Sequence, residues 1–219
     1  MRRPVHGFTL IELVVAITIL GLALAAVMPD VSAWLRNQRI RNMAESMQSG
    51  LQRARAEAVR RNVPVTFWLV NLTDAQTLNN DCTVSATGTS WVVSLDDPAG
   101  KCGSAPSATD DPRLVVAHNA GGGSPVTVAG TRTDLSTSAS QVTFDGFGRI
   151  ATASVGTDLH AIAIAYPTGS RRTDDRGLRI EVTPGGQIRL CDPAVSGTDA
   201  RRCDYTVPTA GGSSGSPSP

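Results

Sequence analysis

A run of 21 residues near the N-terminus, Phe8 to Met28, contains a single charged side chain, Glu12, and follows a basic start with Arg2 and Arg3. As a helix rising ~1.5 Å per residue, this run is roughly 30 Å long, which is the thickness of the hydrocarbon core of a bilayer. It is either a cleaved secretory signal, with a small-residue site in the sequence ALA at residues 23–25, or a retained transmembrane helix over residues 8–29. Inserting a carboxylate costs on the order of 2 kcal/mol or more, and a signal peptide has no use for one. Glu12 therefore favours the retained helix.

The segment from Gly7 to Leu13, with the sequence GFTLIEL behind a short basic leader (residues 1–7), resembles the processing site of type IV prepilins and type II secretion pseudopilins. The resemblance implies cleavage after Gly7 and N-methylation of Phe8 by a prepilin peptidase and methylase. It also implies a single-pass helix retained in the inner membrane, in which Glu12 neutralises the new N-terminal amine of a neighbouring subunit. Such pairing lowers the cost of burying both charges. The alternative for Glu12 is a carboxylate that only reaches up to the lipid headgroups.

Residues 30–62 continue the helix with an amphipathic pattern, in which apolar side chains recur at spacings of three and four. This stripe is predicted to pack on a sheet, and it consists of Ile40, Met43, Ala44, Met47, Leu51, Ala54 and Ala58. The same half of the helix contains seven arginines and two glutamates. The arginines fall largely on positions outside the apolar stripe, which is typical of a solvated face. Asn62 and Pro64 are expected to end the helix, because a residue before proline favours extended backbone.

Residues 63–205 are predicted to form a β-rich domain, because short extended runs alternate there with turn residues. Aromatic residues make up only 4% of the chain and Gly and Pro occur 21 and 13 times, which disfavours a helical bundle. One long helix packed on an antiparallel sheet gives an α+β fold. The tail over residues 206–219 is rich in Gly, Ser and Pro and is predicted to be disordered. The expected strands are Val65–Val70, Ser90–Leu95, Arg113–His118, Pro125–Ala129, Gln141–Phe144, Leu159–Tyr166, Leu178–Val182 and Gln187–Cys191.

The body of the chain resembles one branch of the same family, the GspH/FimT minor pilins and pseudopilins. The resemblance rests on the stretch LQRARAEAVRR (residues 51–61) leading into an extended segment, on the turn FDGFGR (residues 144–149) and on a closing Gly-rich hairpin. It implies a pilin-like fold and a non-enzymatic minor pilin, present in few copies, that helps other pilin subunits to initiate a type IV pilus. The alternative within the family is the H-type pseudopilin of a type II secretion system. In both cases the globular domain would lie in the periplasm.

Four cysteines, Cys82, Cys102, Cys191 and Cys203, form two close pairs in the sequence. If the leader places the body outside the cytoplasmic membrane, they are expected to form disulfides. Of the three possible connectivities, the local one (82 to 102 and 191 to 203) closes the smallest loops. The alternative is a four-cysteine zinc site, which the lack of a Cys-x-x-Cys pair disfavours.

The residues that an enzyme needs are scarce. His6 lies in the leader, while His118 and His160 lie at or in predicted strands and are expected to be structural. No His-Glu-x-x-His helix or phosphate-binding loop occurs, and the pattern Gly-x-Ser-x-Gly occurs only in the tail that is predicted to be disordered, where it forms no nucleophile elbow. We therefore predict no catalytic residue, metal or cofactor. The competing class, a secreted hydrolase with a cleaved signal peptide, would need a mature chain that begins after Ala25 or Ala26.

Seven arginines against five acidic residues gather at the C-terminal hairpin (residues 171–203). Arg176, Arg179 and Arg189 are therefore candidates for contacting the phosphates of double-stranded DNA. DNA uptake in natural transformation is a task of some FimT-like minor pilins, whose closing hairpin carries a Gly-Arg-x-Arg pattern. The matching segment here reads GQIR, so Gln187 replaces the first arginine and removes a charge. The alternative is a solvated face that neighbouring acidic residues partly neutralise.

Overall fold

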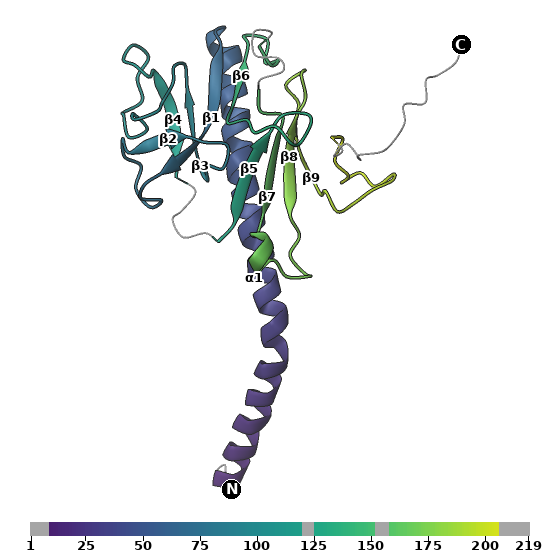
Figure 1. Cartoon of the computed structure of the whole chain (residues 1–219). Helices are drawn as coiled ribbons and strands as arrows, with labels where there is room; N and C mark the ends of the chain where they lie inside the picture. Colours follow the sequence, from purple (N-terminus) through teal and green to yellow (C-terminus); the bar gives the residue numbers. More distant parts are fainter. Residues whose placement is uncertain (1–8, 120–124, 152–157, 206–219) are drawn as a thin grey trace, which may run out of the picture.

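The computed structural model describes residues 9–119, 125–151 and 158–205, with backbone alone for residues 25–30. One long helix carries a β-rich domain on its C-terminal half, and its N-terminal half projects away from that domain (Figure 1). This is the α+β arrangement that the sequence predicts. The predicted leader (residues 1–7), Phe8 and the predicted tail (residues 206–219) lie outside the described residues.

Helix α1 runs without interruption from Leu10 to Arg61, so the two predicted halves form one helix. It ends where the sequence predicts: Asn62 adopts a left-handed backbone with φ of 53°, and its N–H bonds to the carbonyl oxygen of Val59 at 3.4 Å. The predicted apolar stripe is confirmed as core, because each of its seven side chains is at most 4% exposed.

The first sheet is antiparallel and is organised around β1. Strands β3 and β4 lie in turn beyond one edge of β1. The other edge is shared by two strands. β6 pairs with the beginning of β1, where Val65 lies opposite Phe144, and β2 pairs with the end of β1, where Leu72 lies opposite Cys82. The strands are β1 (Val65–Leu72), β2 (Cys82–Val84), β3 (Ser90–Ser94), β4 (Leu114–His118) and β6 (Gln141–Phe144).

The second sheet is also antiparallel, in the order β5-β7-β8-β9. Its last two strands form a hairpin in which Glu181 lies opposite Arg189, and Arg179 opposite Cys191. A 3-10 turn, η2 (Thr168–Ser170), begins the loop between β7 and β8. The strands are β5 (Thr127–Thr131), β7 (Ala161–Ala165), β8 (Leu178–Val182) and β9 (Ile188–Cys191).

Each of the eight strand ranges expected from the sequence overlaps an observed strand. Strand β2, with three residues, was not predicted. It pairs only with the last residues of β1, and a disulfide at Cys82 holds its first residue. Such a short strand has too few residues to show an alternating pattern.

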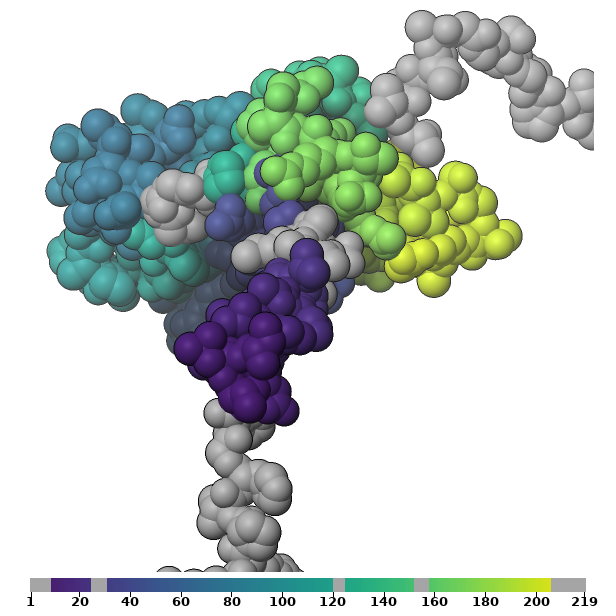
Figure 2. Space-filling view, turned by 90° about the horizontal axis from the view of Figure 1, so that it is seen from below, coloured from purple at the N-terminus to yellow at the C-terminus, as the bar shows by residue number. Residues whose placement is uncertain are grey.

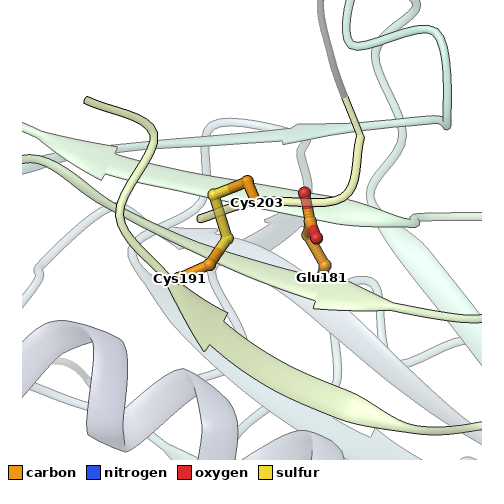
Figure 3. Close-up of side chains that lie close together, drawn as sticks. All are labelled: Glu181, Cys191 and Cys203. Carbon is orange, nitrogen blue, oxygen red and sulfur yellow. A yellow bond between two sulfur atoms is a disulfide. The ribbon is translucent and has the colours of Figure 1, made fainter. Parts of the chain in front are cut away.

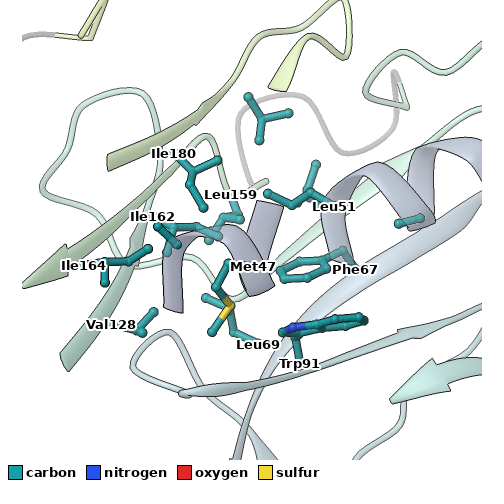
Figure 4. Packing of buried hydrophobic residues seen from close by; sticks show 14 of the residues in the cluster. Met47, Leu51, Phe67, Leu69, Trp91, Val128, Leu159, Ile162, Ile164 and Ile180 are labelled. Carbon is teal, nitrogen blue, oxygen red and sulfur yellow. The ribbon is translucent and has the colours of Figure 1, made fainter. Parts of the chain in front are cut away.

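The apolar stripe of α1 packs against both sheets at once (Figure 4). From the helix, Met47 and Leu51 lie at the centre of the cluster. The first sheet contributes Phe67, Leu69 and Trp91, and the second contributes Val128, Ile162, Ile164 and Ile180. The helix therefore joins the two sheets into one core.

Gly50 allows the close approach of the first sheet to α1. A Cβ atom at this position would lie 2.7 Å from the Trp91 ring and 2.8 Å from the Phe67 ring. Trp91 also donates a hydrogen bond from Nε1 to Ser46 Oγ at 3.1 Å. Glycine inside a helix costs about 1 kcal/mol, and here it makes room for two aromatic rings.

Candidate functional site

The N-terminal half of α1 is apolar and uncovered. Its large apolar side chains between Leu10 and Leu24 are 41% to 81% exposed. Figure 2, seen from below the domain, shows this segment standing clear of both sheets. Exposed apolar area of this extent on all sides of a helix marks a surface that another apolar phase or protein covers.

Glu12 lies in the first turn of this exposed segment and forms a capping box with Thr9. The Glu12 N–H donates to Thr9 Oγ1 at 3.3 Å, and the Thr9 N–H donates to Glu12 Oε2 at 3.5 Å. The carboxylate is thus directed toward the start of the helix, where its negative charge is favourable to the helix dipole. The predicted processing residues Gly7 and Phe8 immediately precede this box in the sequence and lie outside the described residues.

The described part of the chain holds no helix that is both long enough and apolar enough to qualify as a membrane span.

Arg36 fixes the β7–β8 loop to the helix just above the point where α1 leaves the domain. Its guanidinium donates to both carboxylate oxygens of Asp175, at 2.7 and 2.5 Å, and to the carbonyl oxygen of Ser170 at 2.8 Å. It also stacks 3.6 Å from the centre of the Tyr166 ring. The hydrogen bonds from Arg36 hold the pKa of Asp175 below its usual value, although burial opposes this. The prediction of a solvated arginine face is wrong for Arg36, whose side chain is only 16% exposed.

A second arginine group lies near the far end of α1. Arg53, Arg60 and Arg61 surround Glu57 at 3.2, 2.6 and 2.9 Å, and the Glu57 side chain is 6% exposed. Burial acts to raise the pKa of Glu57, but hydrogen bonds from Arg60 and Arg61 outweigh it and leave the pKa below its usual value. Arg55 donates from Nε to the carbonyl oxygen of Gly148 at 2.9 Å. These arginines tie the helix to itself and to the turn after β6.

The predicted DNA-contacting residues Arg179 and Arg189 are engaged within the chain. Both guanidinium groups face Glu181, which is 1% exposed, at 3.6 and 3.5 Å. Arg179 Nη1 also donates to the carbonyl oxygen of Tyr205 at 2.8 Å, and Arg189 Nη2 lies 2.9 Å from the carboxylate of Asp204. Their charges are therefore partly neutralised within the chain, as the alternative to DNA binding expects, and the acidic partner that they share, Glu181, is buried.

Glu181 holds the C-terminal segment against β8 and β9. Its two carboxylate oxygens accept the backbone N–H groups of Asp204 at 2.8 Å and Tyr205 at 3.0 Å. The Tyr205 hydroxyl donates to the carbonyl oxygen of Val182 at 3.2 Å. Burial, with the nearby charges of Glu181 and Asp204, raises the pKa of this hydroxyl. We call this group of contacts around Glu181 the C-terminal clasp.

Arg176, the third predicted DNA-contacting residue, is exposed and lies apart from the C-terminal clasp. Its backbone N–H donates to Asn37 Oδ1 at 2.8 Å. Its side chain lines a surface pocket of about 260 Å³ together with Arg41 and Arg201, whereas Arg179 lines a different pocket.

All four cysteines are in disulfides with the local connectivity, Cys82–Cys102 and Cys191–Cys203. A four-cysteine zinc site is therefore incompatible with the structure. Glu181 brings a carboxylate oxygen within 4.8 Å of Cys191 and Cys203 (Figure 3), but both sulfurs are already bonded to each other. This group is not a metal site, and the disulfide instead supports the segment that Glu181 binds.

Both histidines of the body contact other side chains or backbone groups, although His118 is exposed overall. His160 is buried, and its Nδ1 lies 2.9 Å from the carbonyl oxygen of Val182. The His118 ring packs edge-on against Trp91 at 5.3 Å between centroids, and burial lowers the pKa of His118.

Two family models match the chain. The prokaryotic N-terminal methylation motif matches residues 2–28, and the model described as type II transport protein GspH matches residues 43–211. Among curated proteins, no sequence is significantly similar to the chain.

Two solved structures are also similar, both of the type IV minor pilin FimU of Pseudomonas aeruginosa. They are 15% and 16% identical to this chain, with TM-scores of 0.45 and 0.42. The first match covers 74% of this chain and 94% of that chain, and the second covers 72% and 97%.

Proposed function

Because the chain belongs to the GspH family of type II transport proteins, which are pilin-type structural subunits and not enzymes, we propose that it helps to initiate assembly of a type IV pilus as a minor pilin. The observation that carries this proposal is the uncovered apolar half of α1, with side chains up to 81% exposed, attached to a domain that packs a separate core. A helix of this kind needs apolar surroundings both before and after assembly. A bilayer provides them first, and the helices of other subunits provide them in a filament.

The N-terminal methylation motif implies a membrane-anchored, pilin-type subunit. We propose that the prepilin peptidase and methylase cleave after Gly7 and methylate Phe8. The apolar helix would then hold the chain in the inner membrane in a single pass, with the β-rich domain in the periplasm. Two disulfides support this placement, because such bonds persist in an oxidising compartment.

Cross-linking from the exposed helix tests the assembly role. A photoreactive amino acid in place of Leu13, which is 59% exposed, should cross-link the chain to other pilin-type subunits in cells. The matched control is the same variant in cells without prepilin peptidase, where we expect these cross-links to be lost. Cross-links that never include a pilin-type subunit would contradict the proposal.

The same experiment distinguishes the two filaments. Cross-linked partners that belong to a pilus would support the minor pilin. Partners from a type II secretion system would instead support the alternative, an H-type pseudopilin, whose helix and domain have the same physical requirements.

DNA binding remains a second proposal with a narrower basis. Arg176 is exposed and shares a pocket with Arg41 and Arg201, so three guanidinium groups line one surface. In contrast, Arg179 and Arg189 hold the C-terminal clasp. If DNA binds here, we expect Arg176 and Arg41 to carry most of the affinity.

Titration of the chain with double-stranded DNA over a salt series measures this affinity and its dependence on salt. Arg41→Gln with Arg176→Gln should lower the affinity and reduce its salt slope by about two, one for each lost phosphate contact. The matched control is Arg149→Gln, which removes one exposed arginine from the turn after β6. Absence of binding at low salt would end the DNA proposal and leave the assembly role unaffected.

A further inference from the structure

The face of the domain that is turned toward the N-terminal half of α1 is formed by the β7–β8 loop. Figure 1 shows η2 and the residues after it as the lowest part of the domain, beside the helix. Several hydrogen bonds hold this loop to the helix. Arg36 binds Asp175, Asn37 Nδ2 donates to the carbonyl oxygen of Asp174 at 2.9 Å, and Arg172 Nη1 donates to Ser32 Oγ at 3.4 Å.

The contact between Arg172 and Ser32 shows how far the loop reaches along the helix axis. Ser32 lies four residues beyond Met28, the last residue of the apolar run. Four residues of helix rise about 6 Å, and the polar layer on each side of a bilayer is roughly 5 to 7 Å thick. If residues 8–29 span the hydrocarbon core, as proposed above, the Arg172 guanidinium lies at the level of the lipid headgroups.

Two further side chains near this level have the chemistry of a membrane interface. Arg171 is next to Arg172 in the sequence, is exposed and forms no ion pair with any described residue, and its guanidinium lies beside Gly177, just before β8. Trp34 is 63% exposed, and it lies about 200° around the helix from Ser32 because each residue turns the helix by about 100°. Arginine and tryptophan thus face the headgroup level from different sides of the helix, and tryptophan is enriched at such interfaces.

The acidic groups near this level are few. Asp175 is already paired with Arg36. Asp174 is exposed on the loop, and Asp30 follows the apolar run in the sequence. The Asp174 carboxylate would face a negative lipid surface unfavourably, but the two neighbouring arginines balance the charges of Asp30 and Asp174. The contact with Ser32 directs Arg172 toward the membrane side.

We propose that three side chains bind the phosphates of anionic phospholipids before the subunit enters a filament. They are Trp34, Arg171 and Arg172, and we name them the headgroup collar. This interaction rests on the proposed membrane anchoring and adds a lipid partner to it. It would hold the domain against the membrane at a defined height. Assembly would then have to break it, because extraction into a filament lifts the domain away from the lipid.

Chemical modification of arginine tests the collar in the full chain without any substitution. The chain is reconstituted into vesicles of phosphatidylcholine alone or mixed with phosphatidylglycerol, and phenylglyoxal is added. Peptide mass spectrometry then gives the modification rate of each arginine. A negative lipid surface covers the guanidinium and favours its protonated form, so we expect Arg171 and Arg172 to react about fivefold more slowly in the anionic vesicles. High salt should restore the rates.

Arg60 is the internal control. It is 64% exposed and lies 28 residues beyond Ser32 on α1, so its rate should be the same in both lipids. Equal rates for Arg171 and Arg172 in both vesicle types, with the chain bound to both, would overturn the collar and leave the anchoring proposal standing. Failure of the chain to float with either vesicle type would overturn the anchoring itself, and the collar with it.

Discussion

Replacing Glu12 with alanine is expected to lower the amount of the chain that assembles with other pilin-type subunits at least tenfold. In the proposed assembly, the Glu12 carboxylate pairs with the N-terminal amine of a neighbouring subunit in a water-poor helix bundle. Removing one partner of a buried pair leaves the other charge uncompensated and costs about 3 to 5 kcal/mol, and about 1.4 kcal/mol is already a tenfold change. The measurement is the fraction of membrane-bound chain that co-isolates with pilin-type subunits after cross-linking.

Glu12→Gln separates this role from helix capping. The structure shows Glu12 in a capping box with Thr9, and a glutamine at the same position also completes such a box. If the charge matters, Glu12→Gln should fail to assemble as completely as Glu12→Ala. The matched control is Glu45→Ala, which removes an exposed carboxylate from the same helix. Normal assembly of Glu12→Gln would contradict the charge-pairing role, and normal assembly of both Glu12 variants would exclude any role of this side chain.

Replacing Glu181 with alanine is expected to destabilise the domain by about 3 to 5 kcal/mol, because it leaves two arginines and two backbone N–H groups without their buried acceptor. Those groups are the guanidiniums of Arg179 and Arg189 and the N–H groups of Asp204 and Tyr205. We also expect faster hydrogen exchange at residues 202–205. The free energy of unfolding can be measured by urea titration of the full chain in detergent.

Glu45→Ala again serves as the control for Glu181. Its carboxylate is exposed, and such surface substitutions usually change stability by less than about 0.5 kcal/mol. If Glu181→Ala unfolds at the same urea concentration as the unchanged chain, the C-terminal clasp does not contribute to stability.

The elements that the sequence predicts well are those with a periodic signal. The helix stripe from Ile40 to Ala58 repeats at spacings of three and four, and every member is buried. The alternation of large and small residues around Ile162 and Ile164 marks strand β7 in the same way. Such local patterns need no knowledge of what lies across the core.

The elements that the sequence could not predict depend on pairs far apart in the chain. Arg36 meets Asp175 across 139 residues, and nothing in its local spacing distinguishes it from the exposed Arg39. The engagement of Arg189 likewise depends on the return of the chain at Asp204, after the Cys191–Cys203 disulfide has closed the loop. A cluster of arginines in a sequence shows charge, but it does not show which of these charges the fold has already neutralised.

Mass spectrometry of the N-terminus, with the chain isolated from cell membranes and from filaments, tests both membrane anchoring and assembly. We predict a mature chain that begins with N-methylated Phe8, retains the whole apolar helix and is present in the fraction that contains other pilin-type subunits. A released chain that begins after Ala25 or Ala26 would contradict it, because a subunit without that helix has no apolar segment through which to anchor or assemble.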